Sequence, residues 1–543
     1  MVNFKFKSKI LLLLILLIGA FLRFYQLGIN PPSLTWDEAA WGYNAYSLGL
    51  DGKDEFGRFL PHDYLESFGD FKPPMYAYLD VFPVKIFGLN AFAVRFPSVL
   101  LGLLTVLLTY FLTKAIFPNS KNKEKYALAA SFILAISPWH LMLSRAAFEA
   151  NVATFFLVFG IFTFIVGMRE KKWLLLLSAA SFAASLYTFN TARIVAPILV
   201  LILAVGFRKK LLERKKETMV ALILGIVLIL PIARFLLSPQ ANLRFKEVNI
   251  FSDIGVIDTV NQEVKNDNNS ALSKILHNRR FAYGVEYLRH YFDNLSPNFL
   301  FITGDGNPKF STQDTGEMYL WDLPFLIAGT LALFKRKEGS WWIIPLWLLV
   351  GIIPAATARE TPHALRIEAV LPTLQILTAI GVVTFLGWVK KYKKVIFAGA
   401  FLLLAANFIY FYHGYLTFYP REFSGEWQYG YKDSINYVLQ NGSSYDQINI
   451  TTALGRPYIY YLFYAKTSPA DFRKEAQISR DVFGFVSVNG FSKYKFGQDL
   501  LAIKTDKKKI LYIDIPKYLP ANANIVKEFF LLNGGVVLKA YTL

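Results

Sequence analysis

The residues best suited to chemistry stand in one long segment, 28–96, between two apolar stretches. It opens with Asp37 and Glu38, and Lys72-Pro73-Pro74 follows further along. Between these motifs it supplies further acids at Asp51, Asp54, Glu55, Asp63, Glu66 and Asp70. An acid held beside a membrane can act as a general base toward a hydroxyl, and a fixed cation can stabilise a departing lipid phosphate. Because long ordered loops usually carry function, we expect the active site here.

A simpler interpretation of this segment stays open. Acidic side chains are favoured in the first turn of a helix, so Asp37 and Glu38 also fit the role of capping a helix and solvating the loop. Lys72 is held by its neighbours, since Pro73 and Pro74 lack a backbone donor and restrict the residue before them to an extended conformation. Composition alone does not separate the catalytic role from the structural one.

Apolar stretches dominate the rest of the chain. Hydrophobic residues make up 54% of the 543 residues and charged residues 18%, whereas soluble proteins carry about 25% charged residues. A membrane-spanning helix needs about 20 mainly apolar residues. The sequence predicts a polytopic α-helical membrane protein with about eleven spans, at 10–27, 97–117, 126–143, 150–168, 173–189, 192–207, 218–236, 320–334, 341–357, 367–388 and 394–413.

Basic clusters fix the predicted orientation. With the N-terminus inside, every second connection should be cytoplasmic and rich in Lys and Arg. The first stretch lacks a small-residue cleavage site, so we predict an uncleaved span in the cytoplasmic membrane. Segments 28–96 and 237–319 and the tail then lie outside. The basic connections fall where this alternation requires them, at 120–125, 169–172, 208–216, 335–337 and 390–394.

The same clusters explain the net charge of +19, which otherwise suggests nucleic acid as a partner. Because the cations are divided among short connections, they indicate membrane orientation and not nucleic-acid binding. The chain has no cysteine, so neither disulfides nor thiol chemistry is available.

The tail changes character after the last apolar stretch. Strand patterns at 446–454 and 508–516 and helix patterns at 432–440 and 456–466 predict a small extracytoplasmic α/β domain. We therefore divide the chain into a catalytic membrane domain, 1–413, and an outer domain, 414–543. The aromatic run RPYIYYLFY is typical of an ordinary folded core. We expect the outer domain to pack on segments 28–96 and 237–319.

Four motifs in order resemble a known family. They are WDEA…YNAYSLGLDGKDEFGRFLP…GDFKPPMYAYL…FGLNAFAVRFPS in the first outer segment, SPWHLMLSRAAFEANVATFF (137–156), GDGNPKFSTQDTGEMYLWDLPFLIAG (304–329) and TPHALRIEAVLP (361–372). Together they resemble the dolichyl-phosphate-mannose–protein mannosyltransferase family, in particular its prokaryotic branch with the aminoarabinose transferases. The resemblance implies a GT-C fold and an enzyme that transfers a sugar from a polyprenyl-phosphate carrier to a protein, lipid or glycan hydroxyl on the outer face, with inversion.

The resemblance also implies roles for particular residues. It places the general base at Asp37 with Glu38 beside it, and a second acid, often Asp in the family, at Glu149. Lys72 matches the lysine expected at the carrier phosphate. The remaining candidates for substrate or phosphate binding are Arg145, Arg366, His363 and Asp70.

Structural alternatives accompany several of these roles. Arg145 and Glu149 lie four residues apart, so they also fit an ion pair on one helix face. Arg366 also fits a marker of the membrane boundary. Gly304-Asp305-Gly306 is a turn by default, although its family position places it near the donor pocket.

The sequence predicts no required cofactor. His140, His290 and His363 face outward on this topology, but no pair has metal-ligand spacing, so each fits a satisfied interfacial histidine. Some family members use a divalent metal, which keeps that option open. Neither a G-x-G-x-x-G nor a Walker-type loop occurs, in keeping with a donor that needs no nucleotide.

Two other classes of protein compete with the enzyme. A transporter or flippase of lipid-linked sugars would show paired repeats and ionisable groups in the middle of its spans. Here the halves show no obvious repeat, and the acids collect in the outer segments. A non-catalytic receptor or scaffold is the third class, and the acid and Lys-Pro-Pro motifs argue against it.

The orientation leads to a first testable prediction. Protease added outside intact cells should cleave within the region after Tyr412, because an even number of membrane crossings separates it from the outer segments. Immunoblotting with an antibody against the C-terminus would follow the cleavage. Cleavage only from the cytoplasmic side would contradict the orientation.

Overall fold

The computed structural model describes residues 2–238, 241, 249–252, 254–389, 393–481, 485–503 and 505–543. The chain forms two compact units. The helical unit comprises Met1–Leu22, Leu101–Leu143 and Glu149–Phe411. The sheet unit comprises Arg23–Leu100, Ser144–Phe148 and Tyr412–Leu543. Each is described by itself below.

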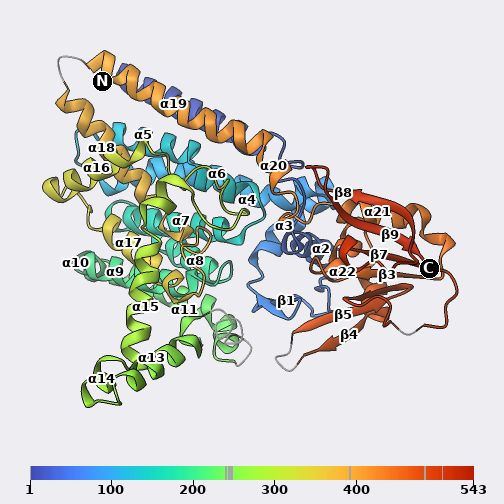
Figure 1. Ribbon diagram of the computed structural model, residues 1–543. Coiled ribbons are helices and arrows are strands. Elements are labelled where there is room, and N and C mark those ends of the chain that lie inside the picture. The colour runs from blue at the N-terminus through green and yellow to red at the C-terminus, as the bar shows by residue number, and fades with distance from the viewer. Residues whose placement is uncertain are drawn as a thin grey trace. The chain divides into compact units, whose positions relative to one another are not determined.

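The helical unit is built almost entirely from helices, among which α7, α8, α9 and α17 pack together (Figure 1). Its long helices and several of its shorter helices coincide with the apolar stretches of the sequence. The elements are α1 (Val2–Phe24), α4 (Ala91–Ile116), α5 (Lys123–Ile136), α6 (Pro138–Arg145), α7 (Glu149–Arg169), α8 (Leu174–Leu186), α9 (Ala192–Gly206), α10 (Arg208–Glu213), α11 (Lys215–Leu236), η1 (Ile250–Ser252), α13 (Ile254–Asn266), α14 (Ala271–Leu276), α15 (Arg279–Asp293), the π-helix η2 (Asn298–Ile302), α16 (Asp322–Arg336), α17 (Ile343–Ile352), η3 (Ala355–Thr357), η4 (Glu368–Val370), α18 (Thr373–Trp388) and α19 (Lys393–Thr417).

Each of the eleven predicted apolar stretches coincides with a helix, but the number of spans is not confirmed. Among the described residues, four helices are long and apolar enough to cross a membrane: Ala91–Ile116, Glu149–Arg169, Lys215–Leu236 and Lys394–Glu422. A fifth arises if Lys123–Ile136 and Pro138–Arg145, bent by 56°, form one span. The other helices are shorter, or, like α1, carry several charges. Of the predicted basic connections, 390–394 lies largely outside the described residues.

Exposed apolar helices mark this chain as an integral membrane protein. The apolar windows of Lys215–Leu236 and Lys394–Glu422 are only 17% and 11% buried. Large exposed apolar surfaces are unfavourable in water. Lipid therefore has to cover these helices.

The helices α16 and α18 approach each other through two glycines. A Cβ on Gly329 would lie 1.8 Å from the carbonyl oxygen of Leu377, and one on Gly381 would lie 1.8 Å from that of Phe325. Backbone contact this close requires residues without side chains, as in other membrane helix pairs. The pair therefore depends on glycine at both positions.

The sheet unit combines the first outer segment with the tail. Its main sheet has seven strands in the order β4-β5-β6-β3-β7-β9-β8, with β3 parallel to β6 and β7 and the other pairs antiparallel. The elements are α2 (Trp36–Asp51), β1 (Leu65–Ser67), β2 (Asp70–Lys72), α3 (Met75–Phe87), α20 (Tyr419–Glu422), α21 (Tyr431–Asn441), η5 (Gly442–Ser444), β3 (Gln447–Thr451), α22 (Pro457–Tyr464), α23 (Pro469–Glu475), β4 (Gln477–Arg480), β5 (Val486–Phe491), β6 (Tyr494–Gly497), β7 (Ile510–Asp514), η6 (Pro516–Tyr518), β8 (Asn524–Phe530) and β9 (Val536–Thr542).

The predictions for the tail are confirmed at the level of its elements. Strands β3 and β7 and helices α21 and α22 occupy the predicted segments. Tyr458, Tyr460, Tyr461 and Phe463 of α22 are buried, so the aromatic run is an ordinary core. The helix α22 packs between α2 and α21 (Figure 1). The expected packing of the tail on segment 28–96 is thus confirmed, and that on segment 237–319 stays a prediction.

The two units divide the chain differently from the predicted boundary between 1–413 and 414–543. The tail is continuous with Arg23–Leu100 and Ser144–Phe148. The physical reason is that α2 buries its apolar side chains against α22. For example, a Cβ on Gly42 would lie 2.5 Å from Val94 and 2.6 Å from Phe463.

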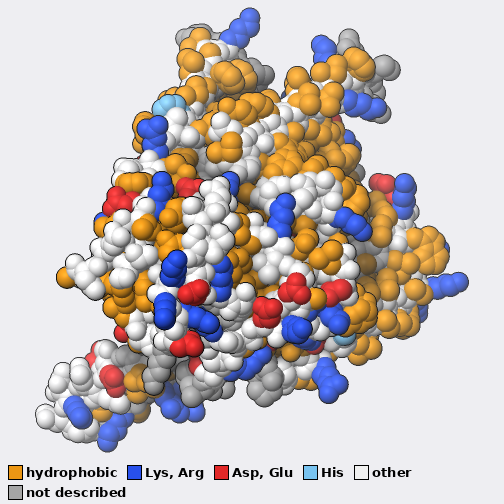
Figure 2. Space-filling view, turned by 90° about the vertical axis from the view of Figure 1, so that its right-hand side faces the viewer, with side chains coloured by type: hydrophobic (Ala, Val, Ile, Leu, Met, Phe, Trp, Pro, Cys, Tyr) orange, Lys and Arg blue, Asp and Glu red, His pale blue; other side chains and the backbone are white. Residues whose placement is uncertain are grey.

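Charged side chains of both signs are interspersed on the face that Figure 2 shows, and hydrophobic side chains gather toward the top of that view. On this face the basic side chains alternate with acidic and neutral ones.

The helix pair α16–α18 provides the second testable prediction. Replacing Gly381 by Val should destabilise the protein by roughly 1–3 kcal/mol or more, because the side chain would enter the backbone of α16. Thermal unfolding in detergent measures the loss. Gly387→Val in the same helix is the control, since no atom lies within 4 Å of a Cβ there. Equal melting temperatures for the two variants would contradict the close contact.

Candidate active site at the start of helix α2

The beginning of α2 positions the acid pair. Thr35 is the N-cap, and its hydroxyl accepts a hydrogen bond from the backbone N–H of Glu38 at 3.2 Å. The Glu38 carboxylate in turn accepts from the backbone N–H of Thr35 at 3.0 Å. This reciprocal capping box fixes where the helix starts. Asp37 consequently stands in the first turn, where the helix dipole favours a carboxylate.

Glu38 is a buried structural anchor. Its side chain is 1% exposed and receives two hydrogen bonds from the Arg95 guanidinium, at 2.9 and 3.2 Å. It also accepts from the backbone N–H of Ala147 at 3.0 Å. Both carboxylate oxygens are thus engaged. The capping interpretation therefore describes Glu38, and these contacts do not favour the catalytic role predicted for it.

Asp37 faces the other way and pairs with Lys72. Its side chain is 49% exposed, whereas that of Lys72 is only 8% exposed. The ammonium group donates a hydrogen bond to Asp37 Oδ1 and lies 5.1 and 5.0 Å from the ring centroids of Trp41 and Phe68. The two residues that the sequence singled out thirty-five positions apart are therefore in direct contact. One is open to a reactant, and the other is held by aromatic rings.

The hairpin β1–β2 delivers Lys72 to this position. Its turn residues Phe68 and Gly69 both have positive φ, 61° and 80°, and such turns match the twist of a tight hairpin. A Cβ on Gly69 would lie 2.1 Å from the Cα of Phe485, so only glycine fits. Asp70 begins the second strand opposite Ser67 and is partly buried. Glu66, the residue before Ser67 in β1, forms an ion pair with Arg480 of the tail.

A buried carboxyl group supports the hairpin from behind. Glu55 accepts a hydrogen bond from the Ser67 hydroxyl at 2.8 Å, and its backbone N–H donates to Asn44 Oδ1 at 2.9 Å. Burial raises the pKa of Glu55 to about 8, although the Ser67 hydrogen bond and the charge of Lys72 oppose the shift. Glu55 is consequently protonated near neutral pH. In the sequence, Glu55 is one of several acids in the same loop, and nothing in its neighbourhood predicts that it is buried.

A second cation lies near Lys72, at a position that the sequence did not single out. The guanidinium carbon of Arg456, at the start of α22, lies 5.7 Å from the ring centroid of Phe68. Lys72 contacts the same ring. Arg456 precedes the aromatic run in the tail, and no motif in the sequence links the tail to the first outer segment. Only the fold brings Arg456 to the hairpin.

Arg145 forms its hydrogen bonds with other residues of the protein. It is fully buried and donates to the backbone oxygens of Arg23 at 3.1 Å and Asn30 at 2.9 Å, and to the Tyr415 hydroxyl at 3.2 Å. These contacts do not favour the predicted phosphate role. Arg145 and Glu149 do not share one helix face, because α6 ends at Arg145 and α7 begins at Glu149.

The other predicted residues belong to the helical unit. Asp305 accepts from the backbone N–H of Ala364 at 2.6 Å and lies 3.6 Å from the ring nitrogen Nδ1 of His363. Burial raises the pKa of Asp305 to about 6 and lowers that of His363 to about 3, so His363 is neutral. The GDG turn and the TPHALR motif are thereby joined. Arg366 lies near Asp305, whose pKa its charge lowers.

Glu149 begins α7 and stands near an acid that the motif analysis overlooked. Glu368, in the same TPHALRIEAV stretch as Arg366, is fully buried and interacts electrostatically with Glu149. The helix α7 packs against η4, which contains Glu368. Glu149 itself is partly exposed, and close acids whose charges interact are more frequent at functional sites than elsewhere.

The histidines give no indication of a metal. Across the described residues, no three His, Asp or Glu side chains gather in metal-binding geometry. His290 bonds to the carbonyl oxygen of Ala358 at 2.8 Å and to Glu286 at 2.9 Å, as expected of a satisfied interfacial histidine. His140 is fully buried in α6. Metal dependence stays untested.

Comparison with solved structures gives the class of the fold. The chain superposes on ArnT from Cupriavidus metallidurans with a TM-score of 0.54 at 12% identity, over 98% of this chain and 97% of that one. ArnT bound to undecaprenyl phosphate gives 0.52 at 12% identity over 99% and 98%. The archaeal oligosaccharyltransferase AglB from Archaeoglobus fulgidus, in complex with an inhibitory peptide and a dolichol-phosphate, gives 0.50 at 14% identity over 85% and 64%. The chain therefore has the GT-C fold of membrane glycosyltransferases.

Sequence comparison gives matches over part of the chain. Residues 71–235 match the family described as dolichyl-phosphate-mannose-protein mannosyltransferase. The putative mannosyltransferase YkcB of Bacillus subtilis is 28% identical over 178 residues, 32% of this chain and 23% of the relative. An uncharacterized protein of Aquifex aeolicus is 32% identical over 174 residues, 31% of this chain and 32% of the relative. The matches span about a third or less of these relatives, and together with the fold they confirm the predicted family resemblance.

Glu55 provides the third testable prediction. Because folding raises its pKa from 4.5 to about 8, its contribution to stability is complete below pH 4.5 and is lost as the pH rises through 8. Glu55→Gln keeps a neutral group at Ser67, so the variant should lose less stability between about pH 5 and 8 than the parent. Melting temperatures at both pH values measure the difference. Glu426→Gln, at an exposed acid of the same unit, should behave like the parent. An unchanged pH dependence in Glu55→Gln would contradict the assignment.

Proposed function

We propose that this chain is a membrane glycosyltransferase that moves a sugar from a polyprenyl-phosphate donor to a hydroxyl acceptor on the outer face of the membrane. The observation that carries the proposal is the contact between exposed Asp37 and shielded Lys72. A base and a cation in contact are what attack by a hydroxyl and departure of a phosphate require at one point. The lipid phosphates held by ArnT and AglB support a donor of this class.

The chemistry follows from the positions of the two side chains. Asp37 accepts the proton of the acceptor hydroxyl as that oxygen attacks the anomeric carbon. The bond between this carbon and the phosphate oxygen breaks on the opposite side, so the configuration inverts. Lys72 stabilises the negative charge that grows on the phosphate, since its ammonium group lies beside the carboxylate that accepts the proton.

Arg456 supplies the second positive charge in this proposal. It shares the Phe68 ring with Lys72, so a phosphate bound near the hairpin would meet both cations. Two charge-assisted contacts suit a lipid phosphate better than one. Arg145 and Glu38, both buried and bonded within the protein, hold the framework instead.

The proposal covers further properties of the protein. It expects an N-terminus in the cytoplasm, the sheet of the tail outside, and the cytoplasmic membrane as the location. The acceptor is a protein, lipid or glycan, and the donor sugar is a hexose or pentose. No cofactor is assigned to the reaction.

Substitution of the base provides the fourth testable prediction. Membranes containing the protein would be supplied with radiolabelled polyprenyl-phosphate sugars, and label in endogenous acceptors would be counted. Asp37→Asn should lower transfer about a hundredfold or more, because the amide cannot accept the proton. Its half-exposed position predicts a normal melting temperature.

Asp51→Asn is the matched control. Asp51 ends the same helix and is also ion-paired, with Arg473. Its variant makes the identical chemical change away from Lys72, and transfer should stay near the parental rate. Near-full activity of Asp37→Asn would contradict the base, and absence of transfer with every donor in the parent would contradict the function.

A further inference from the structure

A cavity in the helical unit is lined by four cations. Its volume is about 660 Å³, and its lining residues are Arg169, Val205, Gly206, Phe207, Arg208, Lys209, Lys210 and Ser340. They come from the end of α7, the passage from α9 to α10 and the segment before α17. Among the residues that the structure describes, no acidic side chain lines it. The four positive charges repel one another, and an anion bound among them would offset this repulsion. A cavity of this composition is therefore suited to an anion.

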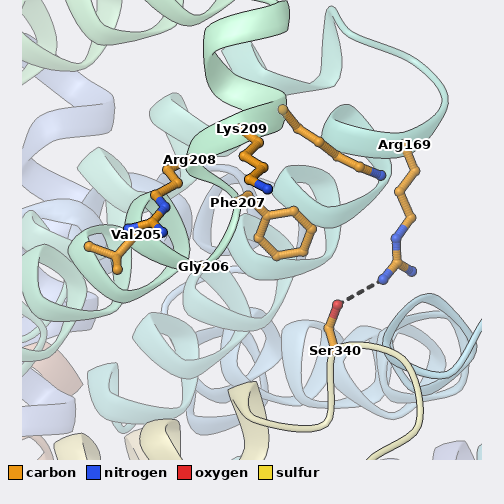
Figure 3. Close-up of a pocket in the computed structure, with 8 residues that line it drawn as sticks. Arg169, Val205, Gly206, Phe207, Arg208, Lys209 and Ser340 are labelled. Carbon is orange, nitrogen blue, oxygen red and sulfur yellow. Dashed lines mark hydrogen bonds between the residues drawn. The ribbon is translucent and has the colours of Figure 1, made fainter.

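The cavity has fixed walls. Arg169 donates to the Ser340 hydroxyl at 2.8 Å and to the backbone oxygen of Ala115, so its guanidinium is held in place (Figure 3). Phe207 is buried against Phe164 and Trp342, with ring centroids 5.6 and 5.8 Å apart. It forms the middle of the site between Arg208 and Arg169 (Figure 3). A Cβ on Gly206 would lie 2.1 Å from Trp342, so the backbone is packed tightly here.

Three lining cations are free to adjust to a ligand. Arg208, Lys209 and Lys210 are exposed, and they form the beginning of α10. One fixed guanidinium and three adjustable cations make a suitable receptor for a phosphate, since the guanidinium orients the oxygens and the lysines add charge.

We propose that this cavity binds the phosphate of an anionic phospholipid on the cytoplasmic side of the membrane. The four cations belong to the predicted cytoplasmic connections 169–172 and 208–216. The inner leaflet carries anionic lipids that attract basic clusters beside apolar helices.

An apolar surface next to the cavity favours a lipid over free phosphate. Val205, which lines the cavity, is 59% exposed, and Leu201, one turn earlier in α9, is 62% exposed. Residues four apart share one helix face. The face continues to Ile194, which is 39% exposed. A phosphate in the cavity can thus lie beside acyl chains that follow α9. The site is separate from Asp37 and Lys72 and does not depend on the proposed transferase activity.

Binding by the purified full-length protein tests this site. The protein in a neutral detergent would be titrated with phosphatidylglycerol, with phosphatidylcholine and with inorganic phosphate, and binding would be followed by native mass spectrometry. We expect phosphatidylglycerol to bind most tightly. Removing two charges in Lys209→Gln/Lys210→Gln should weaken it about tenfold or more.

The control removes the same charges from the same connection. Lys215 and Lys216 are exposed but do not line the cavity, so Lys215→Gln/Lys216→Gln should bind phosphatidylglycerol like the parent. Equal weakening by both double variants would show general surface attraction and overturn the site. Equal binding of inorganic phosphate and phosphatidylglycerol would overturn the lipid, and equal binding of phosphatidylcholine would overturn the role of charge.

Discussion

The buried ion pair between Glu38 and Arg95 holds the candidate active site together. Arg95 also donates to the backbone oxygens of Leu27, Pro31 and Ser33, at 3.0, 2.8 and 2.6 Å. It thereby fixes the path of the chain from the end of α1 to the start of α2. Burying two charges is costly unless both are fully hydrogen-bonded, as they are here. This anchoring leaves Asp37, the neighbour of Glu38, at the surface beside Lys72.

Acids in this protein divide by environment into two kinds. Exposed Asp37 keeps a cationic partner, whereas Glu55 lies in the interior, where burial raises the pKa. A protonated Glu55 accepts a hydrogen bond from the Ser67 hydroxyl. It thereby supports the hairpin without bringing another negative charge close to Lys72. Asp37 is thus the carboxylate that forms the ion pair with Lys72. Adjacent acids in one loop therefore perform structural and chemical tasks that their residue types do not reveal.

The helical unit shows how lipid and charge shape the remaining surface. Helices such as α11 and α19 expose apolar side chains along their length. The basic side chains stand at helix ends, where Arg169 and the cations after α9 surround one cavity. A cation at the end of an apolar helix can reach lipid phosphate while its helix remains among acyl chains. The residues that the sequence analysis assigns to membrane orientation are thus the ones that we propose bind lipid in the folded protein.

The sequence by itself determined the helical membrane class, the positions of the apolar helices and the strands and helices of the tail, and it singled out Asp37 and Lys72. These features depend on local composition and periodicity, which any segment carries with it. The tertiary structure decided which of the loop acids are buried, that Glu38 and Arg145 hold the framework, and that Arg456 comes from the tail to the hairpin. It also joined the tail to the first outer segment. Such facts depend on contacts between residues up to several hundred positions apart, and no local pattern in the chain encodes which distant side chain will fill a given space.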